Sequence, residues 1–110
     1  MSLSTHVLDT ASGAPAVGVP VVAARAEGDE WVELSRGHTD DDGRIGNLVT
    51  GALTAGTHRL TFDTGTWFAA QGTQAFWGDI VITFKVREPD QHHHVPLLLS
   101  PFGYSTYRGS

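Results

Sequence analysis

The sequence predicts an all-β fold, an antiparallel β-sandwich with one short helix. The chain has 110 residues, enough for a single domain with one hydrophobic core. Short apolar and β-branched segments recur at close spacing, separated by Gly, Pro, Asp and Ser, which is typical of sandwiches. One brief segment has the start and stop signals of a helix. We therefore expect one domain over residues 1–110.

Four strands are expected in the first half of the chain. The first run ends at the turn residues of "DTASGAPA", and the second contains Pro20, which indicates a strand edge or a bulge. The polar stretches "EGDE" and "TDDDGRIG" mark two further turns. The expected strands are Thr5–Leu8, Val17–Ala24, Trp31–Ser35 and a weak apolar stretch that ends at Leu53.

Four strands are also expected in the second half. His58–Asp63 alternates between the two faces of a strand, and Asp79–Glu88 is the strongest case because apolar residues occupy every second position. The turn "EPDQ" leads into His92–Leu99. Tyr104–Arg108 alternates as well, which predicts a terminal segment that is held in the fold.

The helix candidate is the stretch "TGTWFAAQG" at Thr64–Gly72. Thr64 or Thr66 can act as its N-cap, and Gly72 can end it. About two turns are too short to be stable alone, so this helix must pack on the sandwich.

Composition excludes several classes of protein. The net charge is −5 without a Lys/Arg cluster, so we expect no nucleic-acid partner. The chain has no cysteine, which excludes disulfides and thiolate metal sites. Its apolar runs are too short to span a bilayer, so no membrane association is expected. The start "MSLSTHV" lacks the basic region and apolar core of a secretion signal, which predicts a cytoplasmic protein.

The histidines raise the question of a metal. His92, His93 and His94 are consecutive, and in a strand the first and third share a face. That pair, with His6 as a third ligand, could bind zinc or copper. Solvated imidazoles on an edge strand are the simpler interpretation, and both stay open here.

The acidic turn offers little by itself. Asp40 and its two acidic neighbours resemble part of a calcium loop, but the twelfth position is Gly51, where a glutamate is needed. A solvated turn is the better interpretation. Arg44 follows this turn. An exposed arginine at the surface is the simpler interpretation, because a buried arginine would need an anionic partner.

Four separated stretches run from one end of the chain to the other, namely "STHVLDTASGAPA" at 4–16, "TDDDGRIGNL" at 39–48, "WFAAQG" at 67–72 and "HHHVPLLLSPFGYSTYRGS" at 92–110. Together they resemble one family, the transthyretin-like 5-hydroxyisourate hydrolases of purine breakdown. The closing Tyr-Arg-Gly-Ser is the most specific element, because it separates the hydrolases from the hormone-carrying transthyretins. The resemblance implies two four-stranded sheets and one short helix.

The same resemblance implies the functional residues. His6 precedes Val-Leu-Asp, Arg44 follows the acidic turn, and His94 precedes Val-Pro-Leu-Leu, as in the family. His93 stands where the family commonly has tyrosine. The implied catalytic residues are His6, Arg44, His94 and Ser110, and the implied substrate-binding residues are these four with Tyr107 and Arg108.

The implied reaction is hydrolysis of 5-hydroxyisourate to 2-oxo-4-hydroxy-4-carboxy-5-ureidoimidazoline in urate degradation. We expect one histidine to take a proton from water and Arg44 to stabilise the oxyanion, with the assignment of the two histidines left open. No metal or other cofactor is expected. The family also implies a homotetramer, a dimer of dimers with active sites in the channel between dimers.

Three alternatives compete with this interpretation. The first is a non-catalytic transthyretin-like carrier of small molecules, for which a channel lined by His6, Arg44 and His94 would be too polar for an aromatic hormone. The second is the metalloprotein described above. The third is an inert interaction module, which would leave the terminal signature unexplained.

Overall fold

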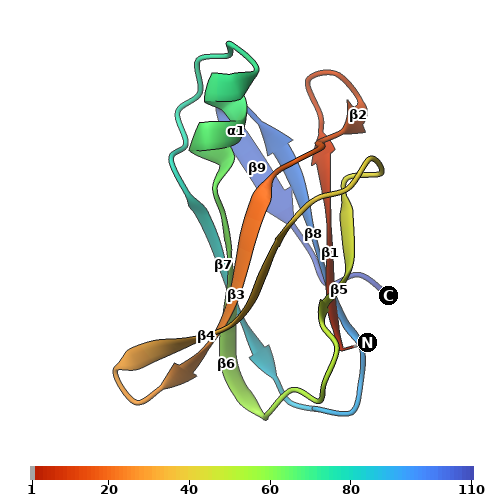
Figure 1. Cartoon of the computed structure of the whole chain (residues 1–110), viewed down its shortest axis with the longest axis vertical. Coiled ribbons are helices and arrows are strands. Elements are labelled where there is room, and N and C mark those ends of the chain that lie inside the picture. The colour runs from red at the N-terminus through yellow and green to blue at the C-terminus, as the bar shows by residue number, and fades with distance from the viewer. Residues whose placement is uncertain (1) are drawn as a thin grey trace.

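The computed structural model describes residues 2–110, whose strands form two sheets packed face to face (Figure 1). The first sheet has the order β2-β1-β8-β9, with β5 also paired to β1, and the second has the order β4-β3-β6-β7. The first sheet consists of β1 (Leu3–Asp9), β2 (Ala14–Pro15), β5 (Arg44–Val49), β8 (His93–Ser100) and β9 (Gly103–Thr106). The second consists of β3 (Pro20–Glu27), β4 (Glu30–His38), β6 (Gly56–Phe62) and β7 (Ile80–Val86), and helix α1 (Thr64–Ala70) connects β6 to β7. The predicted sandwich with one short helix is confirmed.

Two details differ from a pair of four-stranded antiparallel sheets. Within residues 2–110 the first sheet has a fifth member, the two-residue strand β2. In addition, β1 and β8 run parallel. The chain passes through the whole second sheet between these two strands, and such a long crossover allows a parallel pair where a short hairpin would not.

The pairing of β1 sets the register of the first sheet. On one side Ser4 lies opposite His94, and on the other side His6 lies opposite Arg44. These residues are far apart in the sequence, so the sheet is what brings them together. Side chains of paired residues share a face, which places these four on one surface.

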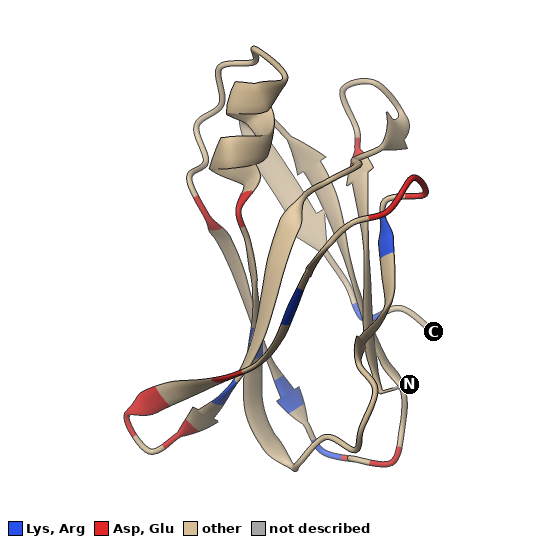
Figure 2. Cartoon of the chain, in the orientation of Figure 1, with Lys and Arg blue, Asp and Glu red and all other residues tan. Residues whose placement is uncertain are grey.

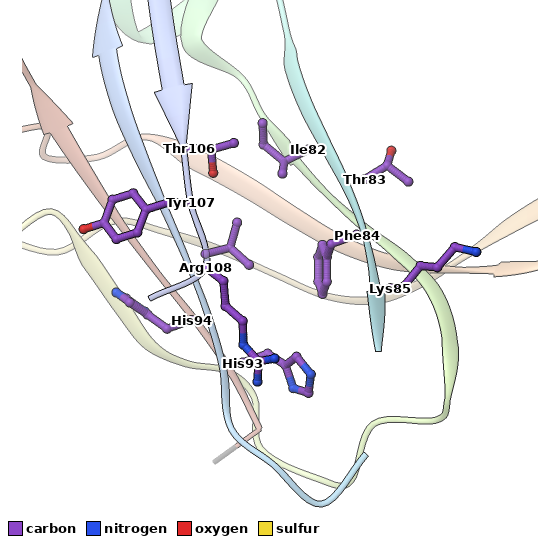
Figure 3. Close-up of a pocket in the computed structure, with 10 residues that line it drawn as sticks. Ile82, Thr83, Phe84, Lys85, His93, His94, Thr106, Tyr107 and Arg108 are labelled. Atoms are coloured by element: carbon purple, nitrogen blue, oxygen red, sulfur yellow. The ribbon is translucent and has the colours of Figure 1, made fainter. Parts of the chain in front are cut away.

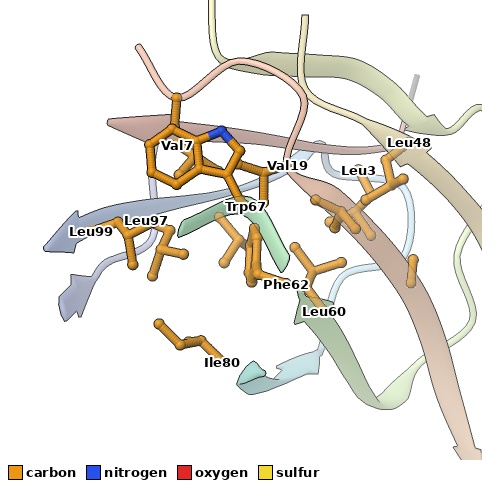
Figure 4. Packing of buried hydrophobic residues seen from close by; sticks show 14 of the residues in the cluster. Leu3, Val7, Val19, Leu48, Leu60, Phe62, Trp67, Ile80, Leu97 and Leu99 are labelled. Carbon is orange, nitrogen blue, oxygen red and sulfur yellow. The ribbon is translucent and has the colours of Figure 1, made fainter. Parts of the chain in front are cut away.

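The core lies between the two sheets (Figure 4). In β1 the side chains alternate, so Leu3, Thr5 and Val7 face the core while Ser4 and His6 between them lie on the outer face. The opposite sheet contributes Leu60, Phe62 and Ile80, all at most 2% exposed. Because this packing buries the inner face of β1 and β8, their outer face is the one left to contact a ligand.

The residue that caps the N-terminus of the helix is one position earlier than expected. Asp63, not Thr64 or Thr66, is the N-cap, and its carboxylate accepts the backbone N–H of Thr66 at 3.2 Å. The Thr64 hydroxyl instead donates to the carbonyl of Gly78 at 2.8 Å. The predicted stop at Gly72 is confirmed, because this residue follows the helix with φ of 70°.

Two strand boundaries also differ from expectation. Pro20 begins β3, which is an inner strand of its sheet, and the register with β4 shifts between Ala23 and Ala24, where the extra residue is Leu34 of β4. As the first strand residue, Pro20 is tolerated because its missing N–H is not needed there. The expected terminal strand Tyr104–Arg108 is shorter, since β9 ends at Thr106. Beyond it the tail is held by an isolated bridge between Gly109 and His94.

Acidic residues gather in the β3–β4 hairpin and in the turn at 40–42 that leads into β5 (Figure 2). Arg44 follows that turn directly. Of the residues that the structure covers, no helix is long and apolar enough to cross a membrane.

Candidate active site

The outer face of the first sheet carries the polar residues of the sequence motifs. In β1, Thr5 is fully buried and its hydroxyl donates to the carbonyl of Val95 at 2.6 Å, so it faces the core side. Its neighbours Ser4 and His6 therefore lie on the outer face, as the alternation of a strand requires. His94 is aligned with Ser4 and lies on that same face.

A cavity of about 260 Å³ opens on this face. It is built from three separate parts of the chain, namely β1, β5 and the C-terminal segment that begins before β8. Arg44, His94 and Ser110, three of the four predicted catalytic residues, share it. Its lining residues are Ser4, Thr5, Arg44, Gly46, His92, His94 and Ser110.

His6, the fourth predicted catalytic residue, is a neighbour of this cavity but not part of its lining. It is paired with Arg44 across β1 and β5, and its charge acts on His94. The two predicted histidines are thus close together on one face.

A serine hydroxyl connects two of the imidazoles. The Oγ atom of Ser4 lies 2.7 Å from Nδ1 of His94 and 2.8 Å from Nε2 of His92. The prediction that His92 and His94 share a face is confirmed. Because Nδ1 of His94 is engaged by Ser4, Nε2 is the ring nitrogen that can act on a ligand in the cavity.

The surroundings lower the pKa of the His94 imidazole below its ordinary value. The main cause is burial, and the charges of His92, His6 and Arg44 add to it, while a hydrogen bond with the backbone of Ser4 acts in the opposite direction. A lowered pKa keeps the ring neutral at pH 7, which is the form able to accept a proton.

The acidic turn fixes the start of β5 and thereby Arg44. The carboxylate of Asp40 accepts the backbone N–H groups of Asp42 at 2.9 Å and Arg44 at 3.0 Å. These hydrogen bonds hold the pKa of the Asp40 carboxyl below its ordinary value, and the hydrogen bond from Arg44 has the largest effect. The role of the aspartates is therefore structural, as a turn, and the Arg44 side chain is left exposed in the single chain.

Gly43 ties this turn to β1. Its carbonyl accepts the N–H of Val7 at 2.7 Å, and its φ is 73°. A Cβ atom at this position would lie 2.5 Å from the carbonyl oxygen of Val7, so only glycine fits. This close approach brings β5 alongside β1 and sets Arg44 beside His6.

Tyr107 and Arg108 line a second cavity of about 250 Å³ (Figure 3). It lies between β7 and the tail, with Phe84 on one side and His93 on the other. The guanidinium of Arg108 donates to the side-chain oxygen of Gln91 at 3.1 Å, which ties the tail to the turn before β8. The structure thus does not bring these two predicted substrate-binding residues into the cavity of Arg44 and Ser110. His94 lies between the two cavities and lines both.

The candidate metal site does not form as three ligands. Over residues 2–110, no group of three or more His, Cys, Asp or Glu side chains is arranged to hold a metal ion. Between His92 and His94 lies the hydroxyl of Ser4.

Ser4 is the residue at this site that sequence reasoning missed. Ser4 opens the first of the four stretches that carry the resemblance, but no role was assigned to it. Its spacing of two from His6, which puts both side chains on one face of β1, was the clue to its position.

The comparisons with known proteins agree over almost the whole chain. The model of the HIUase/Transthyretin family matches residues 3–109. A 5-hydroxyisourate hydrolase from Caulobacter vibrioides is 50% identical over 113 residues, covering 98% of this chain and 97% of that protein.

Solved structures give the same result. The 5-hydroxyisourate hydrolase of Klebsiella pneumoniae matches with a TM-score of 0.88 and 41% identity, covering 100% of both chains. Sea bream transthyretin in complex with thyroxine matches with a TM-score of 0.92 and 33% identity, covering 99% of this chain and 95% of that one. The chain belongs to the HIUase/Transthyretin family, as its sequence motifs predicted.

Proposed function

We propose that this protein hydrolyses 5-hydroxyisourate to 2-oxo-4-hydroxy-4-carboxy-5-ureidoimidazoline in urate degradation. One observation carries the proposal: Arg44, His94 and Ser110, from separate segments of the chain, line a single cavity. The names of relatives that match nearly the full chain support an enzyme of this specificity.

His94 is the general base in this proposal. Its Nε2 takes a proton from water as the oxygen attacks the ring amide carbonyl, and the N–C bond of the six-membered ring then breaks. A base of lowered pKa remains neutral at pH 7 and is ready for this step. General-base catalysis of this kind contributes about 10²–10⁴-fold. His6, on the same face, orients the water or gives a proton to the leaving nitrogen.

Arg44 stabilises the negative charge that develops on the carbonyl oxygen. Its planar guanidinium offers several N–H donors in a fixed arrangement, which suits neighbouring carbonyl oxygens of a ring. The side chain is exposed in the single chain, so it is free to turn toward a ligand in the cavity. The reaction needs no metal or cofactor, because imidazole and guanidinium supply base and charge.

Ser110 holds the substrate or the water through its hydroxyl. Tyr107 and Arg108, which line the neighbouring cavity, position the tail that carries Ser110. The hydrogen bond of Arg108 to Gln91 supports this role.

We further propose that the active form is a homotetramer, a dimer of dimers. Strands β7 and β9 are each an outer strand of their sheet and carry the exposed side chains of Val81 and Tyr104. An open strand edge with apolar side chains is a surface that folded proteins cover. A cavity as shallow as that of Arg44 and His94 becomes an enclosed site when another copy covers it. Sedimentation velocity measures the mass directly, and a monomer that is fully active would contradict this assembly.

The cytoplasmic location stays a prediction from the sequence.

The test is a coupled assay in which urate oxidase generates the unstable substrate and its ultraviolet decay is followed. The expected result is a decay faster than the uncatalysed rate in proportion to the amount of protein. The same reaction with a His94→Ala variant is the control. Saturable binding of thyroxine with no acceleration would instead favour a carrier, the activity class suggested by the transthyretin neighbour.

A further inference from the structure

Ser4 takes no part in the chemistry proposed above, yet its side chain is central to the site. It is 7% exposed and lies between two imidazoles at hydrogen-bond distance, His92 and His94. These distances, 2.8 Å and 2.7 Å, are those of well-formed hydrogen bonds. The two rings come from the segment that leads into and begins β8, whereas Ser4 comes from β1.

A hydroxyl has a single hydrogen to donate, and this limits the tautomers of the two rings. If the hydroxyl donates to Nε2 of His92, it accepts from Nδ1–H of His94, and both rings carry their proton on Nδ1. If it donates to Nδ1 of His94, it accepts from Nε2–H of His92, and both rings carry their proton on Nε2. The neutral rings therefore have the same tautomer and change it together.

We propose that Ser4 is a positioning residue that passes a proton between His94 and His92 during the hydrolysis proposed above, on which this inference rests. In the first arrangement, Nε2 of His94 has a lone pair and can act as a base. In the second, Nε2 of His94 carries a hydrogen and can act as an acid. The hydroxyl of Ser4 links these two states.

The proton transfers balance over the reaction. Nε2 of His94 takes a proton from water, whose oxygen forms the bond to the carbonyl carbon. The Nδ1 proton of His94 moves to Oγ of Ser4, and the hydroxyl hydrogen of Ser4 moves to Nε2 of His92. His94 is then neutral with a hydrogen on Nε2, and His92 holds the positive charge. When His94 gives its Nε2 hydrogen to the leaving nitrogen, the same transfers run backward and restore the first state.

The two rings differ in their exposure to water. His92 is exposed to water, while His94 is partly buried and lies near His6 and Arg44. An imidazolium is better hydrated at the exposed position. The relay thus removes a positive charge from the ring that has to act again as a neutral group.

The first test reads the tautomers directly and does not depend on activity. In the intact protein with ¹⁵N-labelled histidine, at a pH where the rings are neutral, the chemical shifts of Nδ1 and Nε2 report which nitrogen carries the hydrogen. We expect His92 and His94 to have the same tautomer, and the Ser4→Ala variant to change the ring-nitrogen shifts of both. Opposite tautomers, or shifts that Ser4→Ala leaves unchanged, would overturn the proposal.

The second test separates a proton relay from simple orientation of the ring. The variant His92→Gln keeps an oxygen that can accept the Ser4 hydrogen, but an amide cannot hold the transferred proton. A relay predicts that Ser4→Ala and His92→Gln both lower kcat about 10–100-fold with little change in KM, and that Ser4→Thr restores most of kcat. If His92→Gln has native kcat and an unchanged pH profile, the relay is wrong.

A matched control is the Thr10→Val variant. The Thr10 hydroxyl donates to the carbonyl of Leu99 at 3.0 Å, so it also links the β1 end to β8, but far from the cavity. Its removal should leave kcat unchanged. A wild-type protein without hydrolase activity would overturn the proposed function and the relay in hydrolysis, and the ring-nitrogen shifts would still decide whether Ser4 couples the two imidazoles.

Discussion

Gly109 lies directly against the imidazole of His94. A Cβ atom at this glycine would approach Cδ2 of His94 more closely than the 3.0 Å that real Cβ atoms keep, and it would also lie 3.1 Å from Cγ. The backbone N–H of Gly109 donates to the carbonyl of His94 at 2.8 Å, which keeps the two residues in contact. The tail therefore sets the position of the His94 imidazole, the proposed general base.

The variant Gly109→Ala should lose most of its activity while remaining folded. The added methyl group must displace either the imidazole or the tail, and a shift of about 1 Å at a catalytic group can cost about 10²-fold in rate. Steady-state kinetics with freshly generated substrate measures kcat, and circular dichroism monitors the fold.

The control for this variant is Gly51→Ala. No atom lies within 4 Å of a Cβ at Gly51, so the added methyl group meets open space. Equal kcat values for the two variants would show that the contact between Gly109 and His94 has no effect on catalysis.

Replacing Arg44 should affect the rate far more than the fold. The turn before β5 is held by the backbone N–H of Arg44 on Asp40, which any side chain leaves in place. We expect Arg44→Ala to lower kcat by about 10²–10³-fold, the usual effect of losing a donor to an oxyanion. Arg44→Lys should recover only part of this loss, because an ammonium lacks the planar arrangement of donors. Arg87→Ala, which removes an exposed arginine outside the cavity, serves as the control.

The acid limb of the pH profile of kcat/KM should lie below pH 6.5, the ordinary histidine pKa. Burial and the neighbouring charges lower the pKa of His94, so the neutral base persists to lower pH. Removing one of those charges with His6→Gln should raise the pKa of His94 and move the limb to higher pH, whatever happens to the maximal rate. His38→Gln, at an exposed position on β4, should leave the limb where it is. An unchanged limb in His6→Gln would mean that another group controls the acid side.

His93 should make the stability of the protein depend on pH. Its ring is 4% exposed and faces the interior, where burial lowers its pKa, with the charges of Arg108, His92 and His58 adding to this effect. The unfolded chain binds a proton here at higher pH than the folded chain does. The free energy of unfolding should therefore decrease as the pH falls from 6.5 toward the lowered pKa.

The test of this prediction is urea denaturation at several pH values. His93→Tyr, the residue common in the family at this position, should reduce the loss of stability at low pH. His38→Gln should leave it as in the wild type, because that ring is exposed. A wild-type protein with equal stability at pH 8 and pH 5.5 would rule out a buried imidazole as the cause.

Much of the site could be predicted from the sequence because its motifs fall on strands. The alternation around His6 and His94 gives their face correctly, and the turn signal before Arg44 gives its place at the start of a strand. The family resemblance then supplied the connection between these segments. Local pattern alone left Arg44 as a surface residue near acidic neighbours.

The remaining features depend on tertiary contacts that no local pattern encodes. Asp63 caps the helix in place of Thr64, because the hydroxyl of Thr64 donates a hydrogen bond to the carbonyl of Gly78 across a loop. The link through Ser4 exists only because β1 pairs with β8, residues about 90 positions away. The parallel direction of that pair likewise follows from the path of the chain between the sheets.

The pairing of β1 with β8 also has a kinetic consequence. The β3–β4 hairpin closes over a short turn, whereas the sheet with the proposed catalytic residues requires contact between positions 90 residues apart, such as Ser4 and His94. Long-range pairings form slowly because the intervening chain must first be ordered. During refolding from denaturant, enzymatic competence should consequently return last, after most of the β-sheet signal has already recovered.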